Sequence, residues 1–125
     1  MIFACLGANG GTAREIIALL LQLDAHQVPV TEVRCIIRNA EDPLRKPPIH
    51  HDLFALVGSD SRLKIVSGDC TNADSVVNAL KNVQIVFFCA CGSREGYQAL
   101  AGVDDRSLDI VATAGKIFFL RCIFE

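Results

Sequence analysis

The stretch CLGANGGTAREII, residues 5–17, decides the fold of this chain. It begins at the end of the apolar run MIFACL, whose residues 2–6 have the length of a buried strand. It continues into a helix expected from Gly10 to about Asp24, because apolar residues recur there at i, i+3, i+4 and i+7. The apolar face of this helix is expected to comprise Ile16, Leu19, Leu20 and Leu23, widened by Ile17 and Leu21.

The glycine-rich turn between this strand and this helix has a spacing that suits phosphate binding. Helix N-terminal N–H groups and the helix dipole attract a dinucleotide's pyrophosphate in this context. Gly7 would permit the tight turn, Gly10 would let the backbone approach the phosphates, and Ala13 is the smallest substitute for a third glycine. Asn9 and Gly10 also accept left-handed backbone angles. The alternative is a strand–helix turn whose glycines serve geometry alone.

Apolar runs and helical patterns alternate along the rest of the chain. Strands are expected at 32–38, 63–68, 83–90 and 116–124, and helices around 53–57, from Thr71 and over 103–114. The helix from Thr71 is expected to begin with a capping-box-like contact to Asp74 and to bury Ala73, Val76, Val77 and Leu80.

Strands that are apolar on both faces and separated by helices indicate a parallel sheet covered on both sides. With right-handed crossovers this is a doubly wound α/β domain, a Rossmann fold, of about five strands in the order 3-2-1-4-5. We expect one domain over residues 1–125. The last strand would be a hydrophobic edge, and such edges invite pairing. The domain is therefore expected to be C-terminally incomplete, the N-terminal part of a longer domain, or to form a homodimer through this strand.

Composition narrows the class of protein. The chain has 125 residues, of which 51% are hydrophobic and 21% charged, so it is long enough for one packed domain. The formal net charge of −2 gives no basic footprint for nucleic acid. No apolar run reaches the roughly 18 residues that span a membrane, and no secretory signal is visible.

The cysteines are placed as small buried hydrophobes rather than as disulfide partners. Cys5, Cys35, Cys89 and Cys122 lie inside apolar runs. Reduced thiols favour the cytoplasm, while import into an organelle through a cleaved leader stays open. Cys89-x-Cys91 is too little for zinc, and His50-His51 is interpreted as solvated loop, so no metal is expected.

The end of the second strand bears on which dinucleotide binds. An NAD site carries an acidic residue there, which holds the ribose 2′-OH. Glu32 stands at the wrong end of that strand, whereas Arg38 stands at the right end and suits a 2′-phosphate. Arg14, Arg45 and Lys46 could add positive charge. NADP(H) is favoured over NAD(H), with the alternative that Arg38 is only a solvated strand-end residue.

The ends of the third and fourth strands complete the expected site. Asp69, with Cys70 beside it, could accept a bond from the adenine amine, or it could instead start the following helix. Ala90 and Gly92 are small enough to let the ribose and nicotinamide pass. Cys91 is the one nucleophile expected near the nicotinamide, but no base for it is identifiable, so no catalytic residue is assigned.

The segments GANGGTAREI, VRCIIRNAEDP, LKIVSGDCTNADSVVNALKNVQIVFFCACG and VDDRSLDIVATA resemble the atypical short-chain dehydrogenase/reductases, and within them the NmrA-like NAD(P)-binding branch. The resemblance covers nearly the whole chain. It implies an oxidoreductase fold with Arg38 at the 2′-phosphate and Asp69 and Cys70 at the adenine. It also implies phosphate contacts from Gly7, Ala8, Asn9, Gly10, Gly11, Thr12 and Ala13.

One departure from the wider group concerns catalysis. Its dehydrogenases use a Tyr-x-x-x-Lys pair as acid/base. The only tyrosine here, Tyr97, has Ala101 four residues later. Two functions therefore stay open: an NADP(H)-dependent oxidoreductase acting on a small molecule, and a non-catalytic NADP(H)-binding redox sensor or scaffold.

Overall fold

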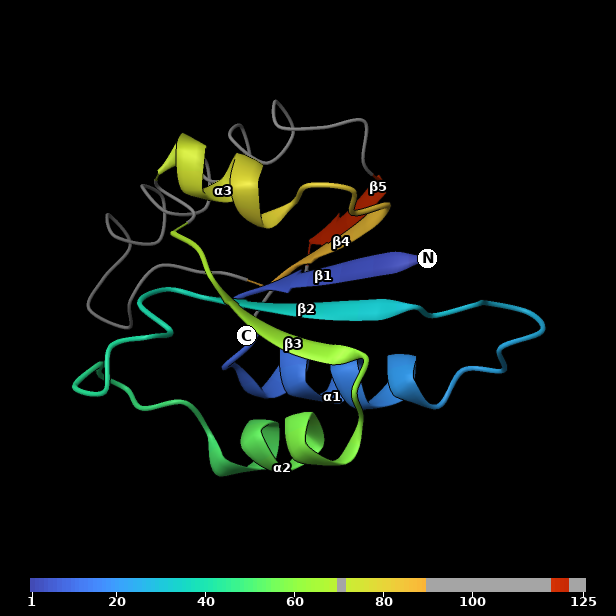
Figure 1. The fold of residues 1–125 in the computed structure, drawn as a ribbon, viewed down its shortest axis with the longest axis horizontal. Helices are drawn as coiled ribbons and strands as arrows, with labels where there is room; N and C mark the ends of the chain where they lie inside the picture. Colours follow the sequence, from blue (N-terminus) through green and yellow to red (C-terminus); the bar gives the residue numbers. More distant parts are fainter. Residues whose placement is uncertain (70–71, 90–117, 122–125) are drawn as a thin grey trace.

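The computed structural model describes residues 1–69, 72–89 and 118–121 (Figure 1). Its strands form one parallel sheet in the order β3-β2-β1-β4-β5, as the sequence predicted. The strands are β1 (Ile2–Leu6), β2 (Glu32–Ile37), β3 (Leu63–Ser67), β4 (Ile85–Phe88) and β5 (Phe118–Arg121). The helices are α1 (Gly11–Leu21), α2 (His51–Ser59) and α3 (Ala73–Ala79). The helix expected over 103–114 and Cys122 lie outside the described residues.

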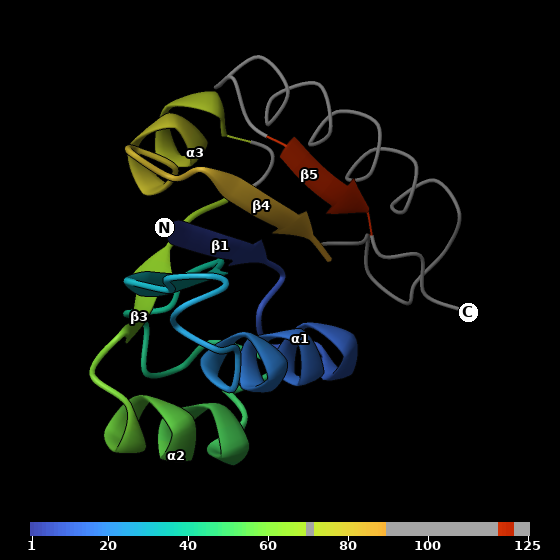
Figure 2. The same ribbon diagram turned by 90° about the vertical axis from the view of Figure 1, so that its right-hand side faces the viewer.

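Helices cover both faces of the sheet. Figures 1 and 2 show α1 and α2 on one face and α3 on the other. Strand β1 faces both layers, because successive side chains of a strand point to opposite sides. Phe3 and Cys5 join the core under α1 and α2, whereas Ala4 and Leu6 join the core under α3. This is the doubly wound arrangement that the apolar strands indicated.

Three cysteines are buried in the sheet, as predicted. Cys5, Cys35 and Cys89 are at most 2% exposed. Burial raises the pKa of the Cys35 thiol to about 12, because the thiolate would lose its hydration. Cys35 therefore stays protonated and packs as a small apolar side chain.

The predicted face of α1 is wrong in part. The helix buries Ala13, Ile17 and Leu20, whereas Leu19 is 63% exposed. Leu23 is 41% exposed and lies beyond the end of the helix at Leu21. The helix is apolar around much of its circumference, so periodicity alone admits more than one buried face. The small Ala13 lets the backbone approach the sheet, and the buried face follows from it at i+4 and i+7.

The predicted start and face of α3 also differ from the structure. Asn72 is the N-cap, and its side chain accepts a hydrogen bond from the Ser75 N–H at 3.3 Å. Thr71, and with it the expected capping contact to Asp74, lies outside the described residues. The helix buries Val76, Ala79 and Leu80, while the predicted Ala73 and Val77 are exposed. Asparagine is among the best N-cap residues, which explains why the helix starts here.

The region between β2 and β3 begins as the loop that its prolines predicted. Helix α2 is longer than expected because His50 caps it at one end and Gly58 does not terminate it. In the described part of the chain, no helix is both long and apolar enough to cross a membrane.

Candidate functional site

The carboxyl ends of four neighbouring strands define the candidate site. In the order of the sheet, β3 is followed by Gly68 and Asp69, β2 by Arg38, β1 by Gly7 and β4 by Cys89. Ligands of open α/β sheets bind at this edge, next to the switch in strand order. Here the switch lies between β1 and β4. We call residues 7–10 the glycine turn and residues 38–50 the β2–α2 loop.

The glycine turn is fixed tightly to the sheet. Gly7 has φ 75°, a left-handed conformation that favours glycine. The N–H groups of Gly7 and Ala8 both donate to the Ile36 carbonyl, at 3.2 and 3.3 Å, and the Gly10 N–H donates to the Gly7 carbonyl at 3.1 Å. The prediction that Asn9 and Gly10 supply left-handed angles is wrong, since Gly10 is extended at φ −75° and Asn9 has no positive φ. Within the glycine turn, Gly7 alone has the left-handed conformation that lets the chain turn sharply after β1.

The amino end of α1 faces the candidate site with its backbone donors. Within the described residues, no side chain caps this end, and its first turn holds no acidic residue. The N–H groups of Gly11, Thr12 and Ala13 therefore remain available to an anion, together with the positive end of the helix dipole. Ala13 is fully buried, as close packing of helix on strand requires.

Two arginines lie together where β2 ends. Arg38 is exposed directly after the strand, and Arg45 folds back so that its Nε donates to the Arg38 carbonyl at 2.9 Å. Burial lowers the pKa of Arg45, and the charge of Arg38 lowers it further, while Asp42 acts in the opposite direction. The two guanidiniums are close enough to repel one another. A bound anion would relieve that repulsion.

Glu32 lies at the opposite end of the same strand, as predicted. Its carboxylate contacts Lys64 at 3.2 Å and Arg34 at 3.4 Å. Burial raises the pKa of Glu32, but the hydrogen bonds from Lys64 and Arg34 outweigh it and hold the pKa below its ordinary value. Glu32 therefore stays ionised in a structural ion-pair cluster, away from the glycine turn.

Asp69 is half-buried between β3 and α3. Its carbonyl accepts hydrogen bonds from the Asn72 N–H at 2.9 Å and the Ser75 hydroxyl at 3.0 Å, and its N–H donates to Ser75 Oγ at 2.9 Å. The main chain of Asp69 thus helps to start α3. The other residues predicted at this end of the site, Cys70, Ala90, Cys91 and Gly92, lie outside the described residues.

A contact network between the glycine turn and the start of α2 has no signal in the sequence. Asn9 bonds to the carbonyl of Pro48 and to the N–H of His50. The Arg14 guanidinium lies 2.8 Å from His50 Nδ1 and 3.4 Å from Asp52 Oδ2. These partners are separated by at least 36 residues in the chain, so local patterns could not pair them.

The two histidines differ in their environments. His50 was predicted to be solvated, but it is half-buried, and its Nδ1 accepts the Asp52 N–H at 3.1 Å as the cap of α2. His51 is 86% exposed, as predicted. In the described residues, ligand atoms of His50, His51 and Asp52 lie within 4.8 Å of one another. Arg14 already contacts two of them, and its positive charge disfavours a metal ion there.

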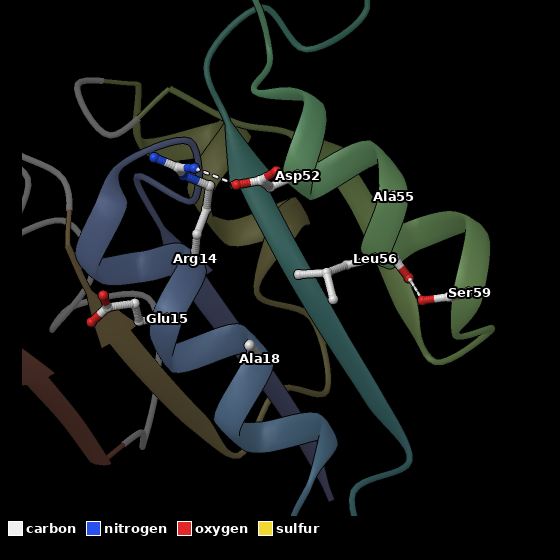
Figure 3. A pocket seen from close by; sticks show the side chains of 7 residues that line it. All are labelled: Arg14, Glu15, Ala18, Asp52, Ala55, Leu56 and Ser59. Atoms are coloured by element: carbon white, nitrogen blue, oxygen red, sulfur yellow. Dashed lines mark hydrogen bonds and ion pairs between the residues drawn. The ribbon is translucent and has the colours of Figure 1, made fainter.

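A shallow groove of about 550 Å³ runs between α1 and α2. Figure 3 shows the Arg14–Asp52 ion pair at one end of it and Ser59, whose hydroxyl donates to the Leu56 carbonyl, at the other. The groove lies in the helical layer, whereas the candidate site lies at the strand ends. It is therefore separate from the candidate dinucleotide site.

A parallel sheet, a glycine turn after β1 and an open helix N-terminus define a dinucleotide-binding Rossmann domain. Comparison with known sequences gives the family. The profile of NAD(P)H-binding domains matches residues 7–116, and the chain belongs to this family. The family model thereby confirms the NAD(P)H-binding domain that the resemblance implied. No curated protein matches the sequence.

Solved structures share the fold at low sequence identity. A double mutant of the dTDP-glucose 4,6-dehydratase DesIV from Streptomyces venezuelae, with NAD bound, has a TM-score of 0.71 at 21% identity over 91% of this chain. NADPH-bound carbonyl reductase from chicken fatty liver has a TM-score of 0.70 at 18% identity over 90% of this chain. Triphenylmethane reductase from Citrobacter sp. with NADP(H) has a TM-score of 0.68 at 20% identity over 97% of this chain. This chain covers 35%, 46% and 36% of those chains, respectively.

Proposed function

We propose that this chain is the NADP(H)-binding domain of an NmrA-like oxidoreductase of the cytoplasm. The observation that carries the proposal is the pair of guanidiniums, Arg38 and Arg45, at the carboxyl end of β2. An acidic side chain at this place would hold the 2′-OH of NAD, whereas a guanidinium makes charge-assisted bonds to the 2′-phosphate of NADP. Two of the similar structures, the carbonyl reductase and the triphenylmethane reductase, hold NADP(H).

Different residues of the site would bind different parts of the dinucleotide. The backbone from Gly7 to Ala13 would hold the pyrophosphate through the amino end of α1. Arg38 and Arg45 would hold the 2′-phosphate. Asp69 and Cys70 would contact the adenine, and Ala90, Cys91 and Gly92 would leave room for the nicotinamide half.

The bound nicotinamide would supply a hydride for transfer to a small-molecule substrate. This chain's own part in that reaction is to bind and orient the cofactor. The sequence holds no Tyr-x-x-x-Lys pair, which favours a second function for these residues, an NADP(H)-binding redox sensor or scaffold without turnover. The two functions share the same cofactor site and differ only in whether hydride leaves it.

A calorimetric titration with NADPH and, separately, NADH tests the cofactor preference. We expect tighter binding of NADPH. The Arg38→Glu variant should lose about 10- to 100-fold in NADPH affinity, since hydrogen bonds to charged groups contribute about 1.5–3 kcal/mol. Its NADH affinity should stay unchanged or rise, because a glutamate at this place can hold the ribose 2′-OH of NADH.

Lys81→Glu is the matched control for this titration. It makes the same change of charge at the amino end of the sheet, just before β4, and should leave both affinities unchanged. Equal binding of NADPH and NADH by the unmodified chain would remove the 2′-phosphate argument but keep the dinucleotide site. No binding of either by the folded chain would overturn the proposal.

A further inference from the structure

The side chain of Asn9 bridges two segments that are far apart in the sequence. Its Nδ2 donates to the Pro48 carbonyl at 3.0 Å, and its Oδ1 accepts from the His50 N–H at 2.7 Å. Asn9 belongs to the glycine turn, whereas Pro48 and His50 end the β2–α2 loop. One amide group therefore holds turn and loop together through a donor and an acceptor at once.

The segment that Asn9 holds also carries Arg45. The Arg45 guanidinium donates to the Pro47 carbonyl, next to Pro48, and to the Arg38 carbonyl. A continuous path of hydrogen bonds and chain neighbours thus runs from Asn9 through Pro48 and Pro47 to the two arginines. The geometry of the arginine pair depends on where the far end of the loop is held.

The rest of the loop is held less directly. Near its start, the Ala40 N–H donates to the hydroxyl of Ser67 at 3.3 Å, and Asp42 forms a local turn by accepting the Leu44 N–H at 2.9 Å. Neither contact reaches the glycine turn. Arg14 supports the same end as Asn9 by contacting His50, but it holds the His50 ring rather than the loop backbone.

We propose that Asn9 is a positioning residue that sets the preference for NADP(H) over NAD(H) by holding the β2–α2 loop against the glycine turn. This inference rests on the proposed function, in which the turn binds the pyrophosphate and the arginines bind the 2′-phosphate. The pyrophosphate and the 2′-phosphate belong to one ligand, so the glycine turn and the arginine pair that bind them must keep a fixed separation. Asn9 supplies that separation without touching the 2′-phosphate.

Loosening the β2–α2 loop should change the affinities for NADPH and NADH to different extents. NADPH needs both arginines in place, and a loop freed from Asn9 would have to be ordered when NADPH binds, which weakens binding. NADH has no 2′-phosphate and makes no demand on the arginines. Loss of the bridge should therefore change the ratio of the two affinities, a quantity that a general loss of fold stability does not change.

The test is a titration of the full 125-residue chain and its Asn9→Ala variant with NADPH and with NADH. Asn9 has no positive φ, so alanine removes only the side chain's hydrogen bonds. Two hydrogen bonds contribute about 0.5–1.5 kcal/mol each, so NADPH affinity should fall about tenfold, and NADH affinity less than about threefold. The control is Leu44→Ala in the same loop, whose side chain is 83% exposed, and it should change neither affinity.

A double variant separates positioning from a direct effect. In the Arg45→Ala background, replacing Asn9 should have little further effect on the ratio, because the path from Asn9 to the arginine pair runs through the Arg45 guanidinium. The inference is overturned if Asn9→Ala weakens NADPH and NADH equally or weakens neither. It is equally overturned if the differential effect persists undiminished without Arg45.

Failure of the proposed function has a different signature. In that case the unmodified chain itself binds neither cofactor or binds both equally, and the inference falls with it. If Asn9→Ala does not fold, as judged by thermal unfolding, Asn9→Asp takes its place. Aspartate keeps the acceptor for the His50 N–H and loses only the donor to Pro48. Its charge lies near the pyrophosphate site that both cofactors share, so the affinity ratio still reports on the loop.

Discussion

Replacing Gly68 by alanine would place a methyl carbon 2.7 Å from Ile36 Cγ2 and 3.5 Å from Ala79 Cβ. The first distance is far inside van der Waals contact. Ile36 cannot move aside easily, because it is 1% exposed and its carbonyl accepts the N–H groups of Gly7 and Ala8. The φ of Gly68 is not left-handed, so the cost is one of packing alone.

Overpacking of this kind costs about 1–3 kcal/mol in unfolding free energy. For a domain of this size, that lowers the Tm by about 3–12 °C. Urea denaturation followed by circular dichroism measures the loss. The matched control is Gly58→Ala in α2, where the new Cβ meets nothing within 4 Å. It should raise stability by about 0.5–1 kcal/mol, because alanine favours a helix over glycine.

The two glycine variants should therefore differ in sign. A Gly68→Ala chain as stable as the unmodified one would refute the packing argument. Combining Gly68→Ala with Ile36→Leu, which removes the clashing branch, should cost less than the sum of the two single changes. Strict additivity would show that Ile36 is not the residue against which the new methyl packs.

Two further predictions concern stability. The hydrogen bonds from Arg62 lower the pKa of Asp60 from 3.8 to about 2, so the stability that they contribute is fully present above about pH 4 and is lost as the pH falls through about 2. Urea midpoints measured from pH 5 to pH 2 should thus fall less steeply for Asp60→Asn, and an identical slope would contradict this reasoning. Asn72→Ala removes the cap bond to the Ser75 N–H and should cost about 0.5–2 kcal/mol in urea denaturation, whereas Asn78→Ala, exposed on the same helix, should cost little.

The strands and their order could be predicted because each signal is local or follows from chirality. Runs such as residues 2–6 and 85–90 are apolar throughout, as buried parallel strands require. Right-handed crossovers then leave few arrangements of five strands. The position of Arg38 followed from the same reasoning, because a strand's direction fixes which of its ends lies beside the glycine turn.

The missed features depend on contacts between distant segments. The buried face of α1 was wrong because several faces of that helix are apolar, and the sheet, through Ala13, selects one of them. The link from Asn9 to Pro48 and His50 joins residues about 40 positions apart through main-chain atoms, which leave no mark on residue type. The need for glycine at position 68 likewise arises from the side chain of Ile36 on the neighbouring strand.

Ile36 connects these observations into one physical account of the site. Its carbonyl anchors the glycine turn, and its side chain fills the space left by Gly68, directly before Asp69. The glycine turn, proposed to hold the pyrophosphate, and Gly68, which precedes the predicted adenine contact Asp69, therefore both pack against the same buried residue. A substitution at Ile36 should disturb both ends of the adenosine half together, whereas a substitution at Asn9 should disturb the arginine pair alone. Under the proposed function, the core beneath the site would thus fix where the dinucleotide binds, and the β2–α2 loop would determine which dinucleotide is preferred.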